Sequence, residues 1–100
     1  MIDSTDDLEN IFEQAVKEAE TRRHEYVTIE HLLLALVKDK EIGNVLVDFK
    51  INVSAFIREI ELYLDQEVKD IVIKDPKKPV NPRKTASLER LMNREFTQAL

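Results

Sequence analysis

The sequence predicts an all-α fold, a small bundle of helices that forms one domain. Three observations lead to this prediction. Apolar residues recur at helical spacing along most of the chain, only one glycine and three prolines are present to interrupt helices, and 43% of the residues are hydrophobic. A chain of 100 residues is long enough to bury a single core.

The first two helices follow from their apolar positions. Residues 7–19 carry one apolar stripe on an otherwise charged helix, made of Leu8, Ile11, Phe12, Ala15, Val16 and Ala19. Thr28 is the expected N-cap of a second helix, with Val27 and Leu32 spaced for a hydrophobic staple across the cap. Residues 32–37 are apolar nearly all round, so we expect this helix to be buried on more than one side.

Three further segments complete the predicted bundle. Residues 42–49 suggest a short third helix, which Gly43 weakens. Asn52 or Ser54 is placed to cap a fourth helix over residues 53–64. Three prolines and several lysines mark residues 76–84 as an extended loop. Thr85 or Ser87 then caps a last helix, whose apolar positions are Leu88, Leu91, Met92, Phe96 and Ala99.

Composition limits the classes of partner. The net charge of −5 argues against a nucleic-acid partner, which requires a basic face. The absence of cysteine excludes disulfides and thiol chemistry. No apolar stretch is long enough for a membrane span, and the acidic start of the chain is unlike a signal peptide, so we expect no membrane partner and a cytoplasmic location.

The two ends of the chain are similar to each other. Residues 7–19 align with residues 87–99, so that Leu8 falls on Leu88 and Val16 on Phe96. Any two amphipathic helices share much of this pattern because they share the helical period. The pattern alone therefore leaves both a true repeat and a coincidence open.

The segment from Arg22 to Leu36, RRHEYV followed by TIEHLLLAL, resembles the amino-terminal domain of the Clp AAA+ unfoldases, most closely the ClpA type. The resemblance covers nearly the whole chain and implies a Clp N-domain-like orthogonal helix bundle. That family domain consists of two tandem copies of a four-helix motif. We therefore expect a first repeat in residues 1–75, the loop in residues 76–84, and only the first helix of a second repeat in residues 85–100.

The resemblance also implies a function. ClpA-type domains dock the adaptor ClpS, and their contact positions match Glu25, Glu30 and Thr85, with His24 and Lys84 as weaker candidates. No Walker A segment is present, so we expect a non-catalytic module that binds a ClpS-like adaptor or a substrate and that forms a homodimer if apolar surface stays open on the second repeat. The alternative is a free-standing regulator that competes for adaptor or protease, and whether the reading frame continues into an AAA+ module distinguishes the two.

The two histidines and two glutamates near Thr28 also suggest chemistry. His24 and His31 are seven residues apart, with the predicted cap between them, whereas a helical zinc pair requires a spacing of four. Neither a phosphate loop nor a nucleophile elbow accompanies the carboxylates. We therefore expect no metal, no cofactor and no catalytic residue. Instead, the negative charge of Glu30 should interact favourably with the helix dipole, and His31 should pack near the helix start.

Overall fold

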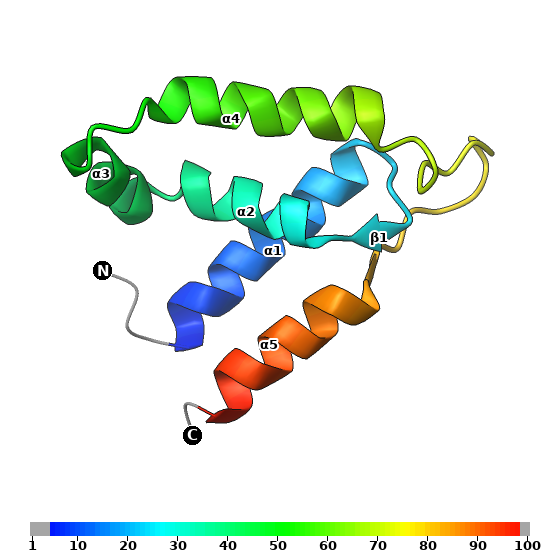
Figure 1. The fold of residues 1–100 in the computed structure, drawn as a ribbon. Coiled ribbons are helices and arrows are strands. Elements are labelled where there is room, and N and C mark those ends of the chain that lie inside the picture. The colour runs from blue at the N-terminus through cyan, green and yellow to red at the C-terminus, as the bar shows by residue number, and fades with distance from the viewer. Residues whose placement is uncertain (1–4, 99–100) are drawn as a thin grey trace.

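A computed structural model describes the backbone of residues 5–98 and the side chains of residues 7–93. Short connections join the helices, and two very short strands lie between them (Figure 1). The elements in chain order are α1 (Thr5–Thr21), β1 (Tyr26–Val27), α2 (Ile29–Lys38), α3 (Lys40–Asp48), α4 (Val53–Leu62), the π-helical turn η1 (Tyr63–Glu67), β2 (Arg83–Lys84) and α5 (Ala86–Gln98).

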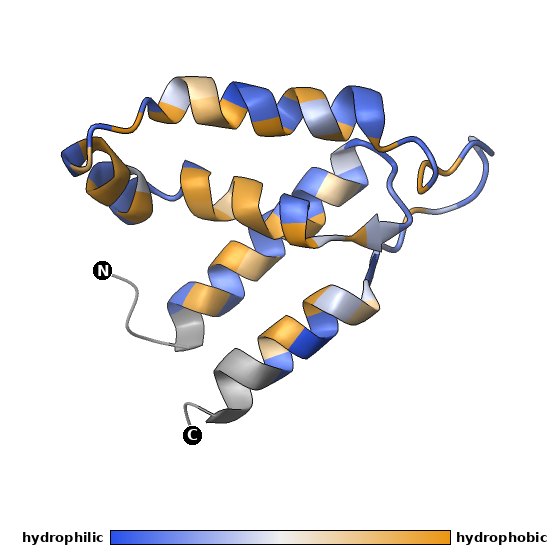
Figure 2. Cartoon of the chain, viewed as in Figure 1, coloured by the Kyte–Doolittle hydropathy of each residue, from blue (hydrophilic) through white to orange (hydrophobic). Residues whose placement is uncertain are grey.

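Helix α2 lies at the centre of the molecule, between α4 on one side and α1 with α5 on the other (Figure 1). Its apolar residues enter two separate core clusters, which explains why the sequence is apolar nearly all round (Figure 2). Ala35 joins the cluster that α1 dominates, whereas Leu34 and Val37 join the cluster formed with α4. The predicted burial of this helix on more than one side is confirmed.

Helix α5 packs on the first part of the chain through its first turns. Leu88 is fully buried in the cluster that holds Ile11, Ala15 and Ala19, and Met92 packs against that cluster. The same region buries Val27, so α5 is fixed close to the beginning of α2. The expected contributions of Phe96 and Ala99 lie outside the described side chains.

Polar caps define where the helices begin. The Thr28 hydroxyl accepts from the His31 backbone N–H, the Asn52 side chain accepts from Ala55, and the Thr85 hydroxyl accepts from Leu88. Thr28 was the predicted cap, and the structure selects Asn52 over Ser54 and Thr85 over Ser87.

The small parallel ladder was not predicted. Tyr26 pairs with Arg83 and Val27 pairs with Lys84, so that the connector before α2 lies beside the connector before α5. Each strand has only two residues, too few for an alternating pattern to be visible in the sequence. A threonine cap follows each strand directly, and the Thr85 N–H donates to the Val27 carbonyl at 3.1 Å. The ladder therefore brings the starts of α2 and α5 together.

Helices α1 and α3 both end in a Schellman motif built without glycine. The residue after each C-cap is Arg23, with φ of 55°, and Lys50, with φ of 63°. In α1 the N–H groups of Arg23 and His24 donate to Glu20 and Ala19, and α3 repeats this pattern at residues 50 and 51. A left-handed conformation costs a residue with a Cβ about 1–2 kcal/mol, so glycine would suit both positions locally.

The two left-handed residues differ in what their side chains do. The Arg23 guanidinium donates to the carbonyl oxygens of Asp75 and Lys78 at 2.8 and 3.0 Å, and more weakly to that of Ile73 at 3.5 Å. Lys50 is exposed and makes no such contact with the described residues. The hydrogen bonds of the Arg23 side chain therefore compensate for the strain of its backbone. The described residues provide no such compensation at Lys50.

The same substitution should have opposite effects at these two positions. Lys50→Gly relieves the left-handed strain and should raise the free energy of unfolding by about 0.5–1 kcal/mol. Arg23→Gly relieves the same strain but removes the guanidinium bonds, and should lower it by about 1 kcal/mol. Urea unfolding followed by circular dichroism measures both values. Changes of the same sign would contradict the role given to Arg23.

Candidate functional site

A buried pair of histidines lies behind the segment that carries the predicted site. His24 and His31 are 1% and 0% exposed, and the His24 Nδ1 atom lies 2.8 Å from the His31 Nε2 atom. Their rings meet edge to face, with centroids 5.0 Å apart. The two residues are seven positions apart in sequence, with a helix cap between them, and the turn after α1 brings them into direct contact.

The hydrogen bonds around the pair assign its protons. The Thr28 N–H donates to the His31 Nδ1 atom at 2.9 Å, so this nitrogen is an acceptor and carries no proton. The proton of His31 is therefore on Nε2, from where it is donated to His24 Nδ1. His24 in turn carries its proton on Nε2. Thr28 and His31 thus form a reciprocal cap in which histidine replaces the usual glutamate or glutamine.

Both histidines are held neutral. Burial, followed by the neighbouring His24 ring and the Arg22 guanidinium, lowers the pKa of His31 to about 4, although the Glu18 carboxylate partly opposes this. Burial and Arg22 also lower the pKa of His24, against the Asp65 carboxylate. A second proton on either ring would place two N–H groups against each other, so the geometry favours the same state.

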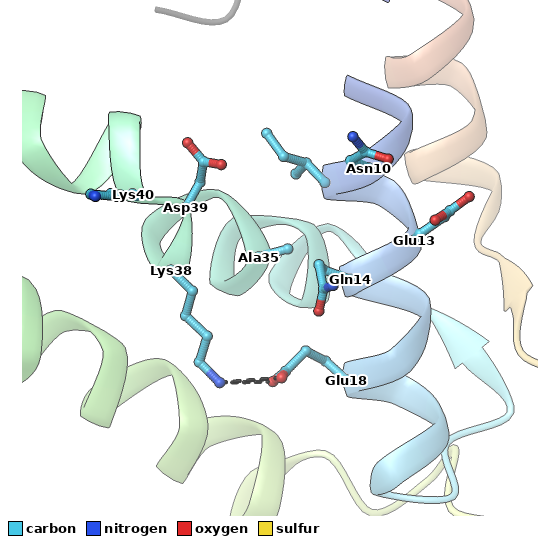
Figure 3. Close-up of a pocket in the computed structure, with 9 residues that line it drawn as sticks. Asn10, Glu13, Gln14, Glu18, Ala35, Lys38, Asp39 and Lys40 are labelled. Carbon is cyan, nitrogen blue, oxygen red and sulfur yellow. Dashed lines mark hydrogen bonds and ion pairs between the residues drawn. The ribbon is translucent and has the colours of Figure 1, made fainter. Parts of the chain in front are cut away.

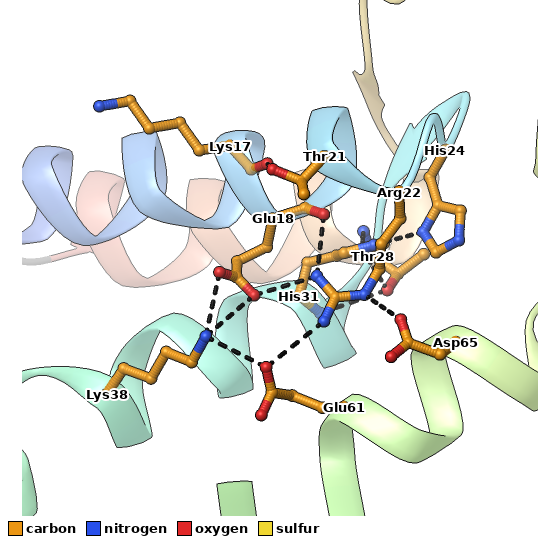
Figure 4. Close-up of polar contacts among 10 residues, drawn as sticks. All are labelled: Lys17, Glu18, Thr21, Arg22, His24, Thr28, His31, Lys38, Glu61 and Asp65. Carbon is orange, nitrogen blue, oxygen red and sulfur yellow. Dashed lines mark hydrogen bonds and ion pairs between the residues drawn. The ribbon is translucent and has the colours of Figure 1, made fainter. Parts of the chain in front are cut away.

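A network of ion pairs lies beside the histidines and joins the helices around them (Figure 4). Arg22 contacts Glu18 at 3.1 Å, Asp65 at 2.7 Å and Glu61 at 3.7 Å. Lys38 contacts Glu18 at 3.2 Å and Glu61 at 3.4 Å. The network connects α1, α2, α4 and η1. Arg22 and Lys38 are paired with carboxylates of the same chain, so their charges are already neutralised within the fold.

An open cleft of about 400 Å³ lies between α1 and the end of α2 (Figure 3). Its lining contains no histidine, serine or threonine, and its Glu18 and Lys38 side chains are paired with each other. Among the described residues, no group of three or more histidine, aspartate or glutamate side chains is placed to hold a metal ion.

The predicted adaptor residues lie around the β1–β2 ladder, and we call Glu25, Glu30 and Thr85 the docking edge. Glu25 is exposed and precedes β1, and its carbonyl accepts from the Arg83 N–H at 3.0 Å. Thr85 follows β2 and is half-buried as the cap of α5. Glu30 is half-buried in the first turn of α2. The ladder therefore brings residues 55 to 60 positions apart in sequence into one region.

The two weaker candidates have different positions. His24 is buried and hydrogen-bonded to His31, so its side chain does not lie at the surface, and its role in adaptor binding stays a prediction. Lys84 is exposed, with its Nζ atom 5.4 Å from the centre of the Phe12 ring. Lys84 thus remains accessible next to the docking edge.

Sequence reasoning missed two apolar side chains in the same region. Tyr26 is 36% exposed in β1, and Ile29 is 41% exposed at the start of α2. Neither residue belongs to an apolar stripe of the predicted helices, so only the tertiary arrangement shows that both are exposed beside the docking edge. Partly exposed aromatic and aliphatic groups beside carboxylates are typical of protein-binding surfaces.

Comparison with known families supports the resemblance seen in the sequence. The family model described as the Clp repeat (R) N-terminal domain matches residues 3–99. The match identifies the family and does not separate the ClpA type from its other members. Among the described helices, none combines the length and the apolar character needed to cross a membrane.

The buried histidines should make stability depend on pH. In the unfolded chain His31 regains its ordinary pKa of 6.5, above its folded value of about 4, so the unfolded state binds protons first as the pH falls. The contribution of His31 is fully present above pH 6.5 and is lost progressively towards pH 4, by about 3 kcal/mol in total. Urea unfolding between these pH values measures the loss.

His31→Gln provides the matched control. A glutamine at this position can still accept from the Thr28 N–H, as in an ordinary capping box, but it does not titrate. Its stability should therefore fall less than that of the parent chain over the same pH range. Equal losses in the two proteins would refute the neutral histidine pair as the source of the pH dependence.

Proposed function

Because the chain belongs to the Clp N-terminal domain family, we propose that it is a protein-interaction module of ATP-dependent Clp proteolysis. Members of this family are non-catalytic helical domains. We propose more specifically that the docking edge binds a ClpS-like adaptor or a protein substrate in the cytoplasm. The chain would then select what reaches an unfoldase without carrying out chemistry itself.

One observation carries this proposal: the parallel pairing of β1 with β2. It fixes the exposed Glu25 segment against the segment that ends in Thr85, and the caps on Thr28 and Thr85 hold the helix starts in place. Because ladder and caps already order the backbone, a partner would lose little conformational entropy on this side when it binds.

The side chains suggest how a partner would bind. The carboxylates of Glu25 and Glu30 suit charge-assisted hydrogen bonds to basic or imidazole groups. Tyr26 and Ile29 lie between the two glutamates in the sequence, and both side chains are partly exposed. A partner could therefore bury apolar surface beside the carboxylates. A partner that combines a cation with an apolar neighbour would match both features.

Removal of the two carboxylate charges should weaken adaptor binding. Glu25→Gln/Glu30→Gln preserves the shape of the side chains and should raise the Kd for a ClpS-type adaptor about a hundredfold, since each charge-assisted bond contributes about 1.5 kcal/mol. Isothermal titration calorimetry with the purified adaptor measures this change.

Glu59→Gln/Glu67→Gln is the control, because it removes two exposed carboxylates from α4 and η1, away from the ladder. It should leave the Kd within about twofold of that of the parent chain. An equal loss in both double variants would indicate general electrostatic attraction, and undiminished affinity in the first would refute the assignment of the docking edge.

A further inference from the structure

The loop before α5 carries a concentration of positive charge that the docking edge does not use. We call residues 74–84 the basic strap. It holds five cations and a single carboxylate, Asp75, within a chain whose net charge is −5. All five cations are exposed: Lys74, Lys77, Lys78, Arg83 and Lys84.

These cations differ from Arg22 and Lys38 of the bundle. Arg22 and Lys38 are engaged in ion pairs with carboxylates of neighbouring helices. Among the described residues, no carboxylate forms an ion pair with a cation of the strap, and only Lys84 has a ring contact, with Phe12. The single acid, Asp75, accepts the Lys77 N–H at 3.0 Å and so helps to shape the strap.

The strap is also fixed in place. Arg23 donates to the Asp75 and Lys78 carbonyl oxygens, and the Ile73 N–H donates back to the Arg23 carbonyl at 2.8 Å. The Lys78 N–H donates to the Asp75 carbonyl at 3.1 Å, which closes a turn with Pro76 in its favoured second position. β2 anchors the far end against β1. A merely solvated linker would need none of these bonds.

The chemistry of the strap selects the mode of binding. Pro79 and Pro82 have no N–H group, and the Arg83 N–H is already bonded to the Glu25 carbonyl, so an added strand would find few donors here. Recognition must therefore come from the lysine and arginine side chains, which bind carboxylates.

From these observations we propose that the basic strap is a second docking surface, which binds a short acidic segment of a partner protein. A protein segment fits better than a nucleic acid, because the exposed Glu25 beside the strap and the overall negative charge repel a long chain of phosphates. A short peptide can place a few carboxylates on the strap and avoid the rest of the surface. This surface adjoins the docking edge at β2, but it takes a partner of the opposite charge and does not depend on adaptor binding there.

A titration with an octaglutamate peptide, followed by NMR, tests the proposal. We expect saturable binding, with the largest amide shifts in residues 74–84, that weakens as the ionic strength rises. Lys77→Glu/Lys78→Glu should raise the Kd at least about tenfold. Lys50→Glu/Arg58→Glu changes the net charge equally on α3 and α4 and should change the Kd less than about twofold.

Three results would overturn the proposal: the absence of saturable binding, an equal loss in the two double variants, or tighter binding of oligothymidylate than of the peptide. Arg23→Lys tests whether the strap must be held in place, since it keeps the charge but loses the planar guanidinium, whose two nitrogens together reach the Ile73, Asp75 and Lys78 carbonyls. We expect about threefold weaker peptide binding in this variant together with faster amide exchange in the strap. Faster exchange with unchanged affinity would show that the anchoring by Arg23 is irrelevant to binding.

Discussion

The hydrogen bond between His24 and His31 is the constraint on which the docking region depends. It joins His24, three residues beyond the end of α1, to the first turn of α2, across the short segment that contains β1. Because His31 also accepts from the Thr28 N–H, the same ring closes the helix cap. The two side chains connect two helix ends in a buried site. Because both are neutral, they order this region without the cost of removing an ion from water.

The positions of both proposed binding surfaces follow from this constraint. With β1 fixed between the histidines, β2 pairs with it and brings the end of the loop and the start of α5 beside Glu25 and Tyr26. Arg23, next to His24, accepts a left-handed conformation and directs its guanidinium to the carbonyls of the strap. Two surfaces of opposite charge, one acidic and one basic, thus share one frame.

The sequence predicted what depends on local patterns. The stripe of α1, the apolar α2 and the caps at Thr28 and Thr85 follow from side chains within one or two turns of each other. The ladder, the contact between the two histidines and the anchoring of the strap by Arg23 join residues that are far apart in sequence or separated by a turn of unknown shape. Local periodicity contains no information on such contacts. The candidate residues Glu25, Glu30 and Thr85, and the weaker candidate His24, came from family resemblance, and their role stays a prediction. The hydrogen bond that buries His24 against His31 had no signal in the sequence.

The central claim is that a neutral histidine pair holds the frame of a binding module. A long-range proton–nitrogen NMR spectrum of the imidazole rings at about pH 6 tests it most directly, because ordinary histidines are then largely protonated. We predict that His24 and His31 are both neutral, each with its proton on Nε2. A charged ring in either residue, or a proton on Nδ1 of His31, would contradict the account.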